Sequence, residues 1–257
     1  MKINKLDLNY YKKNGYLILR NCINKKIFHN FDNNVLEIII RELNNKKINI
    51  KKNSLIHEGL KVLAKKYPET SSKVYRSINR SYFFLKFIQN YKIASLAAQL
   101  IGTNINKLSC LNPTFRFDIP GDLLHARLWH QESNYFKDVS KGSDGIVCWI
   151  PMNKAYAKNG SVILAVGSHK LGYISSNQTA GKKYRSAQHE IPDKLIQNFK
   201  KKFVHANVGD LAFINFHLVH SSGKNVSQFV RCTSQIRFVR NDGDDYNPPN
   251  LSLKYGT

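Results

Sequence analysis

The second half of the chain is divided into short apolar runs separated by turn residues, and this pattern limits the possible fold more than any other feature. From about residue 108 onward, Gly, Pro, Asn and Asp interrupt the apolar stretches at close intervals. The runs are TFRFDI, HARLWHQE, GIVCWIPM, GSVILAV, KFVHANV, DLAFINFHLVH and FVRCTSQIRFVR. Closely spaced strands with turn residues between them are typical of an antiparallel sandwich or barrel. The sequence therefore predicts a mainly β fold with a barrel core over residues 106–240.

Residues 1–105 carry a different pattern, which predicts one strand followed by helices. The run GYLILR begins at Gly15, after an Asn-Gly turn signal, and suits a strand. Residues 27–43 repeat apolar side chains at helical spacing and are polar on the other face. Residues 71–101 predict two further helices, and the second ends at a glycine cap, Gly102. We expect the strand and the helices of this region to buttress the barrel from outside.

A polar segment, residues 167–190, interrupts the strand pattern. It contains Gly and Ser and has no clear periodicity, so it predicts a long loop. Loops of this length often act as lids over a site. Because no internal repeat and no linker divides the sequence, we expect residues 1–257 to form a single domain, with 167–190 as a candidate lid loop.

The chain is strongly basic, with 40 Lys and Arg against 17 Asp and Glu and a formal net charge of +23. A charge of this size prompts a search for a nucleic-acid footprint. The cations are spread in Lys-Asn-Ile patches such as NNKKINIKKN (44–53), without Arg-rich helices or regular aromatic interleaving. This distribution favours a compositional bias over nucleic-acid binding, and it is compatible with an anionic small-molecule substrate.

The cysteines and the apolar segments indicate where the protein works. Cys22, Cys110, Cys148 and Cys232 are widely scattered, which is typical of reduced core thiols rather than of a zinc site or a disulfide framework. The first residues lack the apolar segment of a secretory signal, and no run reaches the roughly 18 apolar residues of a membrane span. We expect a cytoplasmic protein with no membrane partner.

The stretch WHQES contains two residues that could hold a metal. On a strand, side chains at i and i+2 point the same way, so His130 and Glu132 would face one side. Imidazole plus carboxylate suits Fe(II), Mn or Zn, and a distant second histidine would complete a facial triad. Alone, an H-x-E pair is weak evidence. Downstream, however, an apolar run ends at His220, and the next run carries Arg231, whose planar fork could grip a carboxylate.

In their order and spacing, these blocks resemble the phytanoyl-CoA dioxygenase-like family of Fe(II)- and 2-oxoglutarate-dependent oxygenases. The resemblance is carried by NGYLILRNCI, WHQE, CWIPMNKAYAKNGSVILAVGSHKLG and HLVHSSGKNVSQFVR. It implies a double-stranded β-helix, also called a jelly roll or cupin-like barrel, with flanking α-helices. It also implies Fe(II) as the metal, 2-oxoglutarate as cosubstrate, and oxidation of a substrate by O2 with release of succinate and CO2.

The resemblance further implies roles for individual residues. The matched positions are His130, Glu132 and His220 for the metal, and Arg231, Ser222, Gln131 and Trp149 for 2-oxoglutarate. Arg231 lies eleven residues after His220 (231 − 220), the spacing of the arginine that binds the distal carboxylate in the family. Glu132 stands where the family usually has Asp, although related oxygenases use H-x-E. A carboxylate at this position argues against a halogenase, whose iron needs that place for halide.

Three residues near the metal motif are candidates for contact with the substrate. Arg116 and Arg127 lie on predicted strands close to the expected mouth of the barrel, and Tyr135 follows the metal pair. Arginines on strand surfaces are usually solvated, which is the simpler interpretation of the first two. Tyr135 and its neighbour Phe136 could equally belong to the core. An acidic substrate group is the partner that the two arginines would suit.

The remaining histidines near the site are predicted to have supporting roles. His217 precedes His220 by three residues, and on a regular strand this odd spacing puts the two on opposite faces. His125 lies five residues before His130 and is predicted to be a surface or packing residue. His169, in GSHK, resembles a turn of the family that supports the site without binding iron.

The favoured function is hydroxylation of a small metabolite, for which the basic charge favours an anionic group. Two alternatives stay open. Arg231 and Arg237 fit the R-x5-R pattern of the AlkB-like nucleic-acid demethylases, but the gap of 90 residues between His130 and His220 (220 − 130) is long for that group. The other alternative is a barrel that has lost catalysis and acts as a basic binding module, supported only by Glu132.

Overall fold

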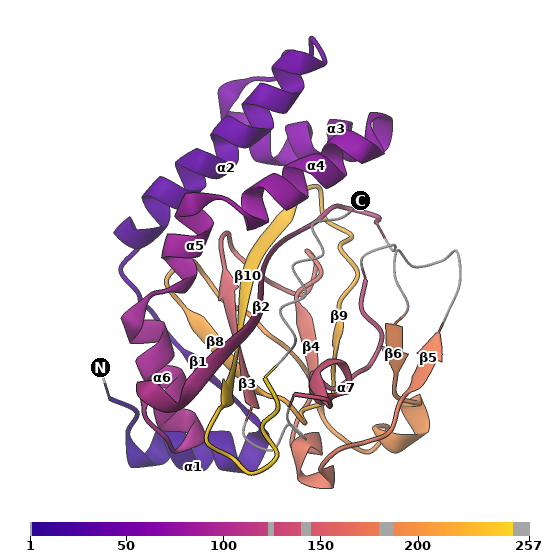
Figure 1. The fold of residues 1–257 in the computed structure, drawn as a ribbon. Helices are drawn as coiled ribbons and strands as arrows, with labels where there is room; N and C mark the ends of the chain where they lie inside the picture. The colour runs from indigo at the N-terminus through magenta and orange to yellow at the C-terminus, as the bar shows by residue number, and fades with distance from the viewer. Residues whose placement is uncertain (1, 123–125, 140–144, 180–187, 249–257) are drawn as a thin grey trace.

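Most helices lie in the first part of the chain and most strands in the second part. The computed structural model describes residues 2–122, 126–139, 145–179 and 188–248 (Figure 1). The helices are α1 Lys5–Asn14, α2 Lys26–Asn45, α3 Leu60–Lys66, α4 Pro68–Asn79, α5 Tyr82–Ile88, α6 Tyr91–Ile101 and α7 Ser133–Phe136. The strands are β1 Tyr16–Leu19, β2 Leu108–Asp118, β3 Gly145–Pro151, β4 Val162–Ala165, β5 Asn177–Thr179, β6 Gln188–Glu190, β7 Lys201–Phe203, β8 Leu211–Asn215, β9 His220–Ser222 and β10 Arg231–Arg240. Short helical turns span Lys52–Ser54, Leu55–Gly59, Ile105–Lys107, Ser168–Leu171 and Asp193–Leu195.

The strands form antiparallel sheets of unequal size. The larger sheet has the order β1-β8-β3-β10-β2, the smaller one has the order β7-β4-β9, and β5 pairs with β6. Apolar side chains of both larger sheets share one buried cluster, in which Val147 and Trp149 of β3 join Val162 and Leu164 of β4. The two sheets therefore pack on each other, as the predicted jelly roll requires.

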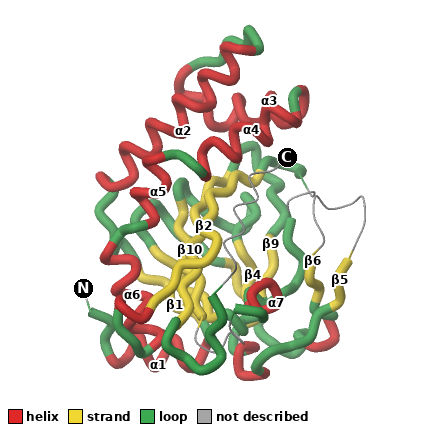
Figure 2. Tube along the Cα trace, in the orientation of Figure 1, coloured by secondary structure: helices red, strands yellow, loops and turns green. Residues whose placement is uncertain are grey.

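Helices of the first half of the chain, among them α2, α5 and α6, cover the outer face of the five-stranded sheet (Figure 2). Helix α2 buries one face, which includes Phe28, Phe31 and Ile39. The ring of Phe31 lies edge-on to Phe115 of β2, with 5.4 Å between ring centroids. Since alternate strand residues point to opposite faces, the helices cover one set of side chains and leave the other for the barrel interior.

The predictions for residues 1–105 are partly confirmed. Strand β1 and helices α2 and α6 lie where the sequence places them, and α6 ends at Gly102 with a left-handed φ of 84°. The prediction of two helices over 71–101 is wrong, because α4, α5 and α6 occupy this stretch. Helix α1 was also missed, although Asn4 caps it by accepting a hydrogen bond from the Asp7 amide at 2.7 Å.

Two predicted strands of the barrel are wrong in detail. HARLWHQE is not a strand in its described part, since only His130 makes a β-bridge and the chain then turns into α7. DLAFINFHLVH divides into β8 and β9, which belong to different sheets. The division occurs after Asn215, whose side chain and carbonyl accept hydrogen bonds from the amides of His217 and Leu218, each at 2.9 Å. These bonds turn the chain from one sheet to the other.

The segment 167–190 is more ordered than the predicted loop. It contains the turn Ser168–Leu171 and the paired strands β5 and β6, while residues 180–187 lie outside the described part. Its role as a lid stays a prediction.

Three of the four cysteines lie in the core. Cys22, Cys148 and Cys232 are buried as predicted, but Cys110 is exposed on β2, where the core prediction is wrong. No helix within the described ranges combines the length and the apolar character needed to cross a membrane.

Candidate functional site

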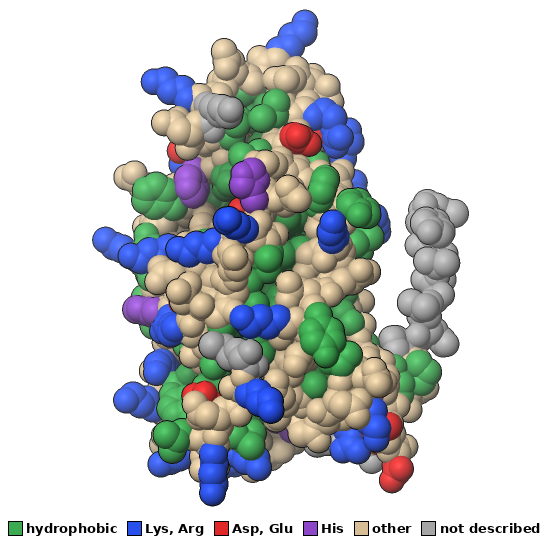
Figure 3. Space-filling model, turned by 90° about the vertical axis from the view of Figure 1, so that its left-hand side faces the viewer, with side chains coloured by type: hydrophobic (Ala, Val, Ile, Leu, Met, Phe, Trp, Pro, Cys, Tyr) green, Lys and Arg blue, Asp and Glu red, His purple; other side chains and the backbone are tan. Residues whose placement is uncertain are grey.

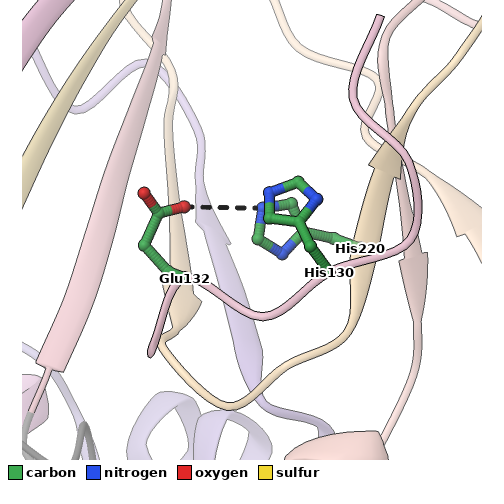
Figure 4. Close-up of side chains that lie close together, drawn as sticks. All are labelled: His130, Glu132 and His220. Carbon is green, nitrogen blue, oxygen red and sulfur yellow. Dashed lines mark ion pairs between the residues drawn. The ribbon is translucent and has the colours of Figure 1, made fainter. Parts of the chain in front are cut away.

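Two neighbouring side chains, His130 and Glu132, and the distant His220 converge in the barrel interior. His130, Glu132 and His220 each offer a ligand atom, and these atoms all lie within 4.8 Å of one another. Figure 4 shows the two imidazoles beside each other, with one Glu132 oxygen directed at His220. That oxygen, Oε2, lies 3.7 Å from His220 Nε2. All three residues are at least nine-tenths buried, so the group is shielded from bulk water.

The backbone holds the two histidines in register. Their amides and carbonyls form a reciprocal β-bridge, with hydrogen bonds of 3.0 Å from His130 and 2.9 Å from His220. In each histidine, Nδ1 donates to the carbonyl two residues earlier, at 2.6 Å for Leu128 and 2.9 Å for Leu218. A donor Nδ1 leaves Nε2 as the basic nitrogen, which is the form that binds a metal.

Glu132 joins the histidines by a different route from the one expected. Its backbone has helical angles, φ −62° and ψ −34°, directly before α7. The alternation of a regular strand therefore does not bring Glu132 to the face of His130. The turn of the chain into α7 does so instead.

The charges of the triad suit a divalent cation. Burial lowers the pKa of both His130 and His220, so the imidazoles are neutral at pH 7. Burial acts against ionisation of Glu132, but the charge of Arg237 and its hydrogen bond to the carboxylate outweigh burial and lower the pKa of Glu132. Two neutral imidazoles and one carboxylate are the donor set of non-heme iron sites that keep open positions. The residues present therefore fit Fe(II).

Arg237 is the partner of Glu132 that sequence reasoning missed. Its Nε donates to Glu132 Oε1, and its Nη1 and Nη2 donate to the Asn112 carbonyl and to Gln235 Oε1, at 2.8 and 2.9 Å. The R-x5-R spacing was the available signal, because an even separation puts Arg231 and Arg237 on one face of a strand.

Arg231 lies on the interior face of β10 beside Trp149, one of the other predicted cosubstrate residues. It is 2% exposed, its Nη2 lies 2.9 Å from Asp118 Oδ2, and its guanidinium carbon lies 5.7 Å from the centre of the Trp149 ring. Within the described part of the chain, Trp149 Nε1 is buried without a hydrogen-bond partner. A buried guanidinium beside an unused N–H donor fits a carboxylate ligand such as that of 2-oxoglutarate.

Ser222 and Gln131 hold the walls of the site in different ways. Ser222 is on β9, and its Oγ accepts a hydrogen bond from the Arg127 amide at 3.1 Å. The Gln131 amide nitrogen donates to the carbonyls of Gly172 and His217, both at 2.7 Å, and its oxygen accepts from the Ile174 amide at 2.8 Å. The structure thus joins Gln131 to the segment 167–190, and its contact with 2-oxoglutarate stays a prediction.

The candidate substrate residues fall into two groups. Arg116 is held by Asp118, with 2.9 Å between Nη2 and Oδ1. Arg127 lies over the ring of Tyr135 at 5.5 Å. The Tyr135 ring in turn meets His130 and His189 edge-on, at 5.5 and 4.7 Å between centroids. Arg127 and Tyr135 therefore form a wall beside the triad.

The other histidines lie outside the triad. His217 Nδ1 faces Ser133 Oγ at 3.2 Å, and Lys12 O lies 3.0 Å from His169 Nε2. His169 thus contacts the turn before β1, where Gly15 has a φ of 79° and a Cβ would come within 2.5 Å of the imidazole. The predicted position of His125 lies outside the described residues.

Comparisons with known proteins place the chain in a family. A family model described as phytanoyl-CoA dioxygenase (PhyH) matches residues 11–233. A protein of Caenorhabditis elegans named probable phytanoyl-CoA dioxygenase is 22% identical over 241 residues, which cover 91% of this chain and 74% of the relative. AviO1 from Streptomyces viridochromogenes Tue57 has a similar structure, with a TM-score of 0.61, 14% identity, and coverage of 97% of this chain and 99% of AviO1.

A second structural neighbour carries the cosubstrate in its description. EctD from S. alaskensis, solved with 2-oxoglutarate and 5-hydroxyectoine, gives a TM-score of 0.57 at 13% identity and covers 93% of this chain and 77% of EctD. At such identities the two structures show the shared fold, and the predicted jelly roll is confirmed. The family match spans most of the 257 residues. The chain belongs to the phytanoyl-CoA dioxygenase family and is a 2-oxoglutarate-dependent dioxygenase with a His-Glu-His triad that could bind iron.

Proposed function

We propose that the protein oxidises a small anionic metabolite at an iron held by His130, Glu132 and His220. The observation that carries this proposal is the buried triad, whose ligand atoms lie within 4.8 Å of one another in the barrel interior that also contains Arg231. When bound, Fe(II) supplies the redox chemistry by which O2 converts 2-oxoglutarate to succinate and CO2 and oxidises the substrate.

The side chains of the chain itself bind and orient the reactants. Neutral His130 and His220 present Nε2, since Nδ1 of each is held by a backbone carbonyl. Arg231 and the N–H of Trp149 offer charge and a donor to the distal carboxylate of 2-oxoglutarate. Asp118 pairs with Arg231 and helps to hold its guanidinium in place. Burial of the whole group excludes water from the reacting atoms.

Arg127 is our candidate for binding an anionic group of the substrate. Its guanidinium is half-buried and lies over Tyr135, and no carboxylate among the described residues pairs with it. Arg116, by contrast, already holds Asp118. Tyr135 contacts His130 edge-on, so an anion at Arg127 would place the rest of a small molecule near the triad. An arginine fork suits carboxylate or phosphate.

Nucleic acid is a less favoured substrate. On the face drawn in Figure 3, the Lys and Arg side chains are dispersed among hydrophobic and uncharged surface and do not gather into one stripe. Strong salt dependence of binding to random oligonucleotides would favour nucleic acid instead.

The first test is an anaerobic titration of metal-free protein with Fe(II) and then 2-oxoglutarate. We expect the visible charge-transfer band of a chelated Fe(II)-2-oxoglutarate complex. Arg231→Met should raise the 2-oxoglutarate concentration for half-maximal absorbance at least about 30-fold, because truncating one partner of a buried charge pair costs about 2–5 kcal/mol. Arg240→Met, on the same strand, is the matched control. No band with folded protein, or an unchanged titration in Arg231→Met, would contradict the assignment.

A second assay tests the charge of the substrate. Succinate formation is measured with pairs of compounds that share a skeleton and differ only as carboxylate or neutral amide. We expect carboxylates to stimulate turnover more than amides, and Arg127→Met to remove this difference without changing the requirement for 2-oxoglutarate. Equal stimulation by both members of every active pair would argue against an anionic substrate.

A further inference from the structure

Arg237 occupies an unusual position for a cation, because it points into the barrel beside residues that would bind a metal. It lies six residues after Arg231 on β10, so both side chains point to the interior face. The pairing of β10 with β2 shifts register between Gln235 and Arg237, which marks a local irregularity of the sheet at this point. The side chain of Arg237 is only 13% exposed.

Each part of the Arg237 guanidinium has a fixed partner. Nη1 donates to the carbonyl of Asn112, a residue with a left-handed φ of 37°, and Nη2 donates to Gln235 Oε1. The guanidinium carbon lies 5.6 Å from the centre of the Phe136 ring. With these contacts made, Nε remains for Glu132 Oε1. These contacts orient the Arg237 guanidinium for Glu132, so little conformational entropy is lost when it binds the carboxylate.

The two oxygens of Glu132 have different tasks as a result. Oε1 accepts from Arg237, while Oε2 lies 3.7 Å from His220 Nε2 (Figure 4). Glutamate has one more rotatable bond than the aspartate usual in the family, so its carboxylate has more orientations to choose from. A carboxylate that bound iron through both oxygens would also occupy one of the three positions needed for 2-oxoglutarate and O2.

We propose that Arg237 is a positioning residue that fixes Glu132 as a ligand through one oxygen and thereby makes the H-x-E triad usable. This inference rests on the proposed function, because it takes Glu132 to be a metal ligand. Arg237 touches neither substrate nor cosubstrate in this role and acts through Glu132.

The test uses Co(II), whose visible absorption reports both affinity and coordination number. Metal-free protein is titrated with Co(II) as wild type, Arg237→Met, Arg237→Lys and the control Arg240→Met. We expect Arg237→Met to weaken Co(II) binding about 10- to 100-fold and to change the band intensity, as loss of an outer contact to a ligand does. Arg237→Lys should be intermediate, since Lys lacks the fork. If Arg237→Met does not fold, Arg237→Lys carries the same test.

A double-mutant cycle separates positioning from a general effect of charge. In Glu132→Asp, the shorter side chain should no longer reach Arg237 and a metal together, so adding Arg237→Met should weaken Co(II) binding less than about threefold further. The inference is overturned if Arg237→Met binds Co(II) within twofold of wild type, or if its effect is the same in both backgrounds.

The proposed metal site has its own control. Glu132→Ala and His220→Ala should each reduce Co(II) affinity strongly. If they do not, the proposed function fails. If they do while Arg237→Met binds normally, only the role of Arg237 fails.

Discussion

The two faces of the five-stranded sheet are made from the same strands but are held in different ways. On β10, Cys232, Ile236 and Phe238 point outward into the core shared with the helices. The alternate residues Arg231 and Arg237 point inward and pair with Asp118 and Glu132. On β10 the outward side chains are thus held by apolar burial, whereas the inward arginines are held by ion pairs and hydrogen bonds.

The residues that stabilise the fold and the residues that serve the site thus lie on opposite faces of the same strand. Burial of apolar surface contributes roughly 25 cal/mol per Å² and needs no particular geometry. Buried charges give little net stability, because desolvation offsets their attraction, but they place atoms with precision. Because successive side chains of a strand point to opposite faces, β10 carries apolar core residues on one face and charged site residues on the other. Substitutions on the two faces should therefore have separable effects.

The largest effect is expected for the interior. His220→Ala should reduce Fe(II)-dependent succinate formation by about 1000-fold or more, because one of three ligands is lost. His217→Ala should keep most of the activity, since His217 contacts Ser133 rather than the triad. The measurement is succinate formed at saturating Fe(II) and 2-oxoglutarate. Equal losses in both variants would break the assignment of the distal ligand.

A smaller effect, of another kind, is expected for the outer face. Ile236 is fully buried against the helices, and Ile236→Ala should lower the free energy of unfolding by about 2–5 kcal/mol. The 2-oxoglutarate requirement of the folded protein should stay within about twofold. Ile236→Val, which removes one methylene at the same position, is the matched control and should lower the free energy of unfolding by only about 0.5–1.5 kcal/mol. Urea unfolding and the cosubstrate titration check the two quantities. A large shift in cosubstrate requirement for Ile236→Ala would show that the faces are coupled.

The smallest effect concerns the contact between the helical layer and the start of β10. His57 Nδ1 accepts a hydrogen bond from the Val230 amide at 3.1 Å, so the imidazole must be neutral. Burial and then Lys61 lower the pKa of His57, while Glu58 opposes this. The unfolded chain therefore binds this proton more readily, and stability should fall as the pH drops below about 6.5.

His57→Asn keeps an acceptor for the Val230 amide but does not titrate. Its urea midpoint should change less between pH 7.5 and pH 5.5 than that of the wild type. An identical change in both proteins would show that His57 does not contribute to the pH dependence.

The sequence predicted those elements whose side chains follow a clear period. Helix α2 and strand β10 belong to this group, whereas β3 was predicted from a continuous apolar run that is buried on both faces. The break between β8 and β9 was not predicted, since the apolar run is continuous and only the hydrogen bonds of Asn215 turn it.

The sequence predicted which residues form the metal triad, but not how their side chains are held. The resemblance supplied the three triad residues, and the structure brings them together. Two ion pairs were not predicted, Arg231 with Asp118 and Arg237 with Glu132. Each ion pair joins residues that are far apart in the chain. The register between strands decides which of these residues meet, and local sequence patterns do not encode that register.

The hydrogen bonds of Gln131 have a mechanical consequence. Gln131 sits between two members of the triad, and its amide grips Gly172 and Ile174 in the segment that ends in the β5–β6 ribbon. A pull on that segment is transmitted through one side chain to the peptide that links His130 and Glu132. The side chain of Gln131 thus couples the positions of Gly172 and Ile174 to the peptide between His130 and Glu132.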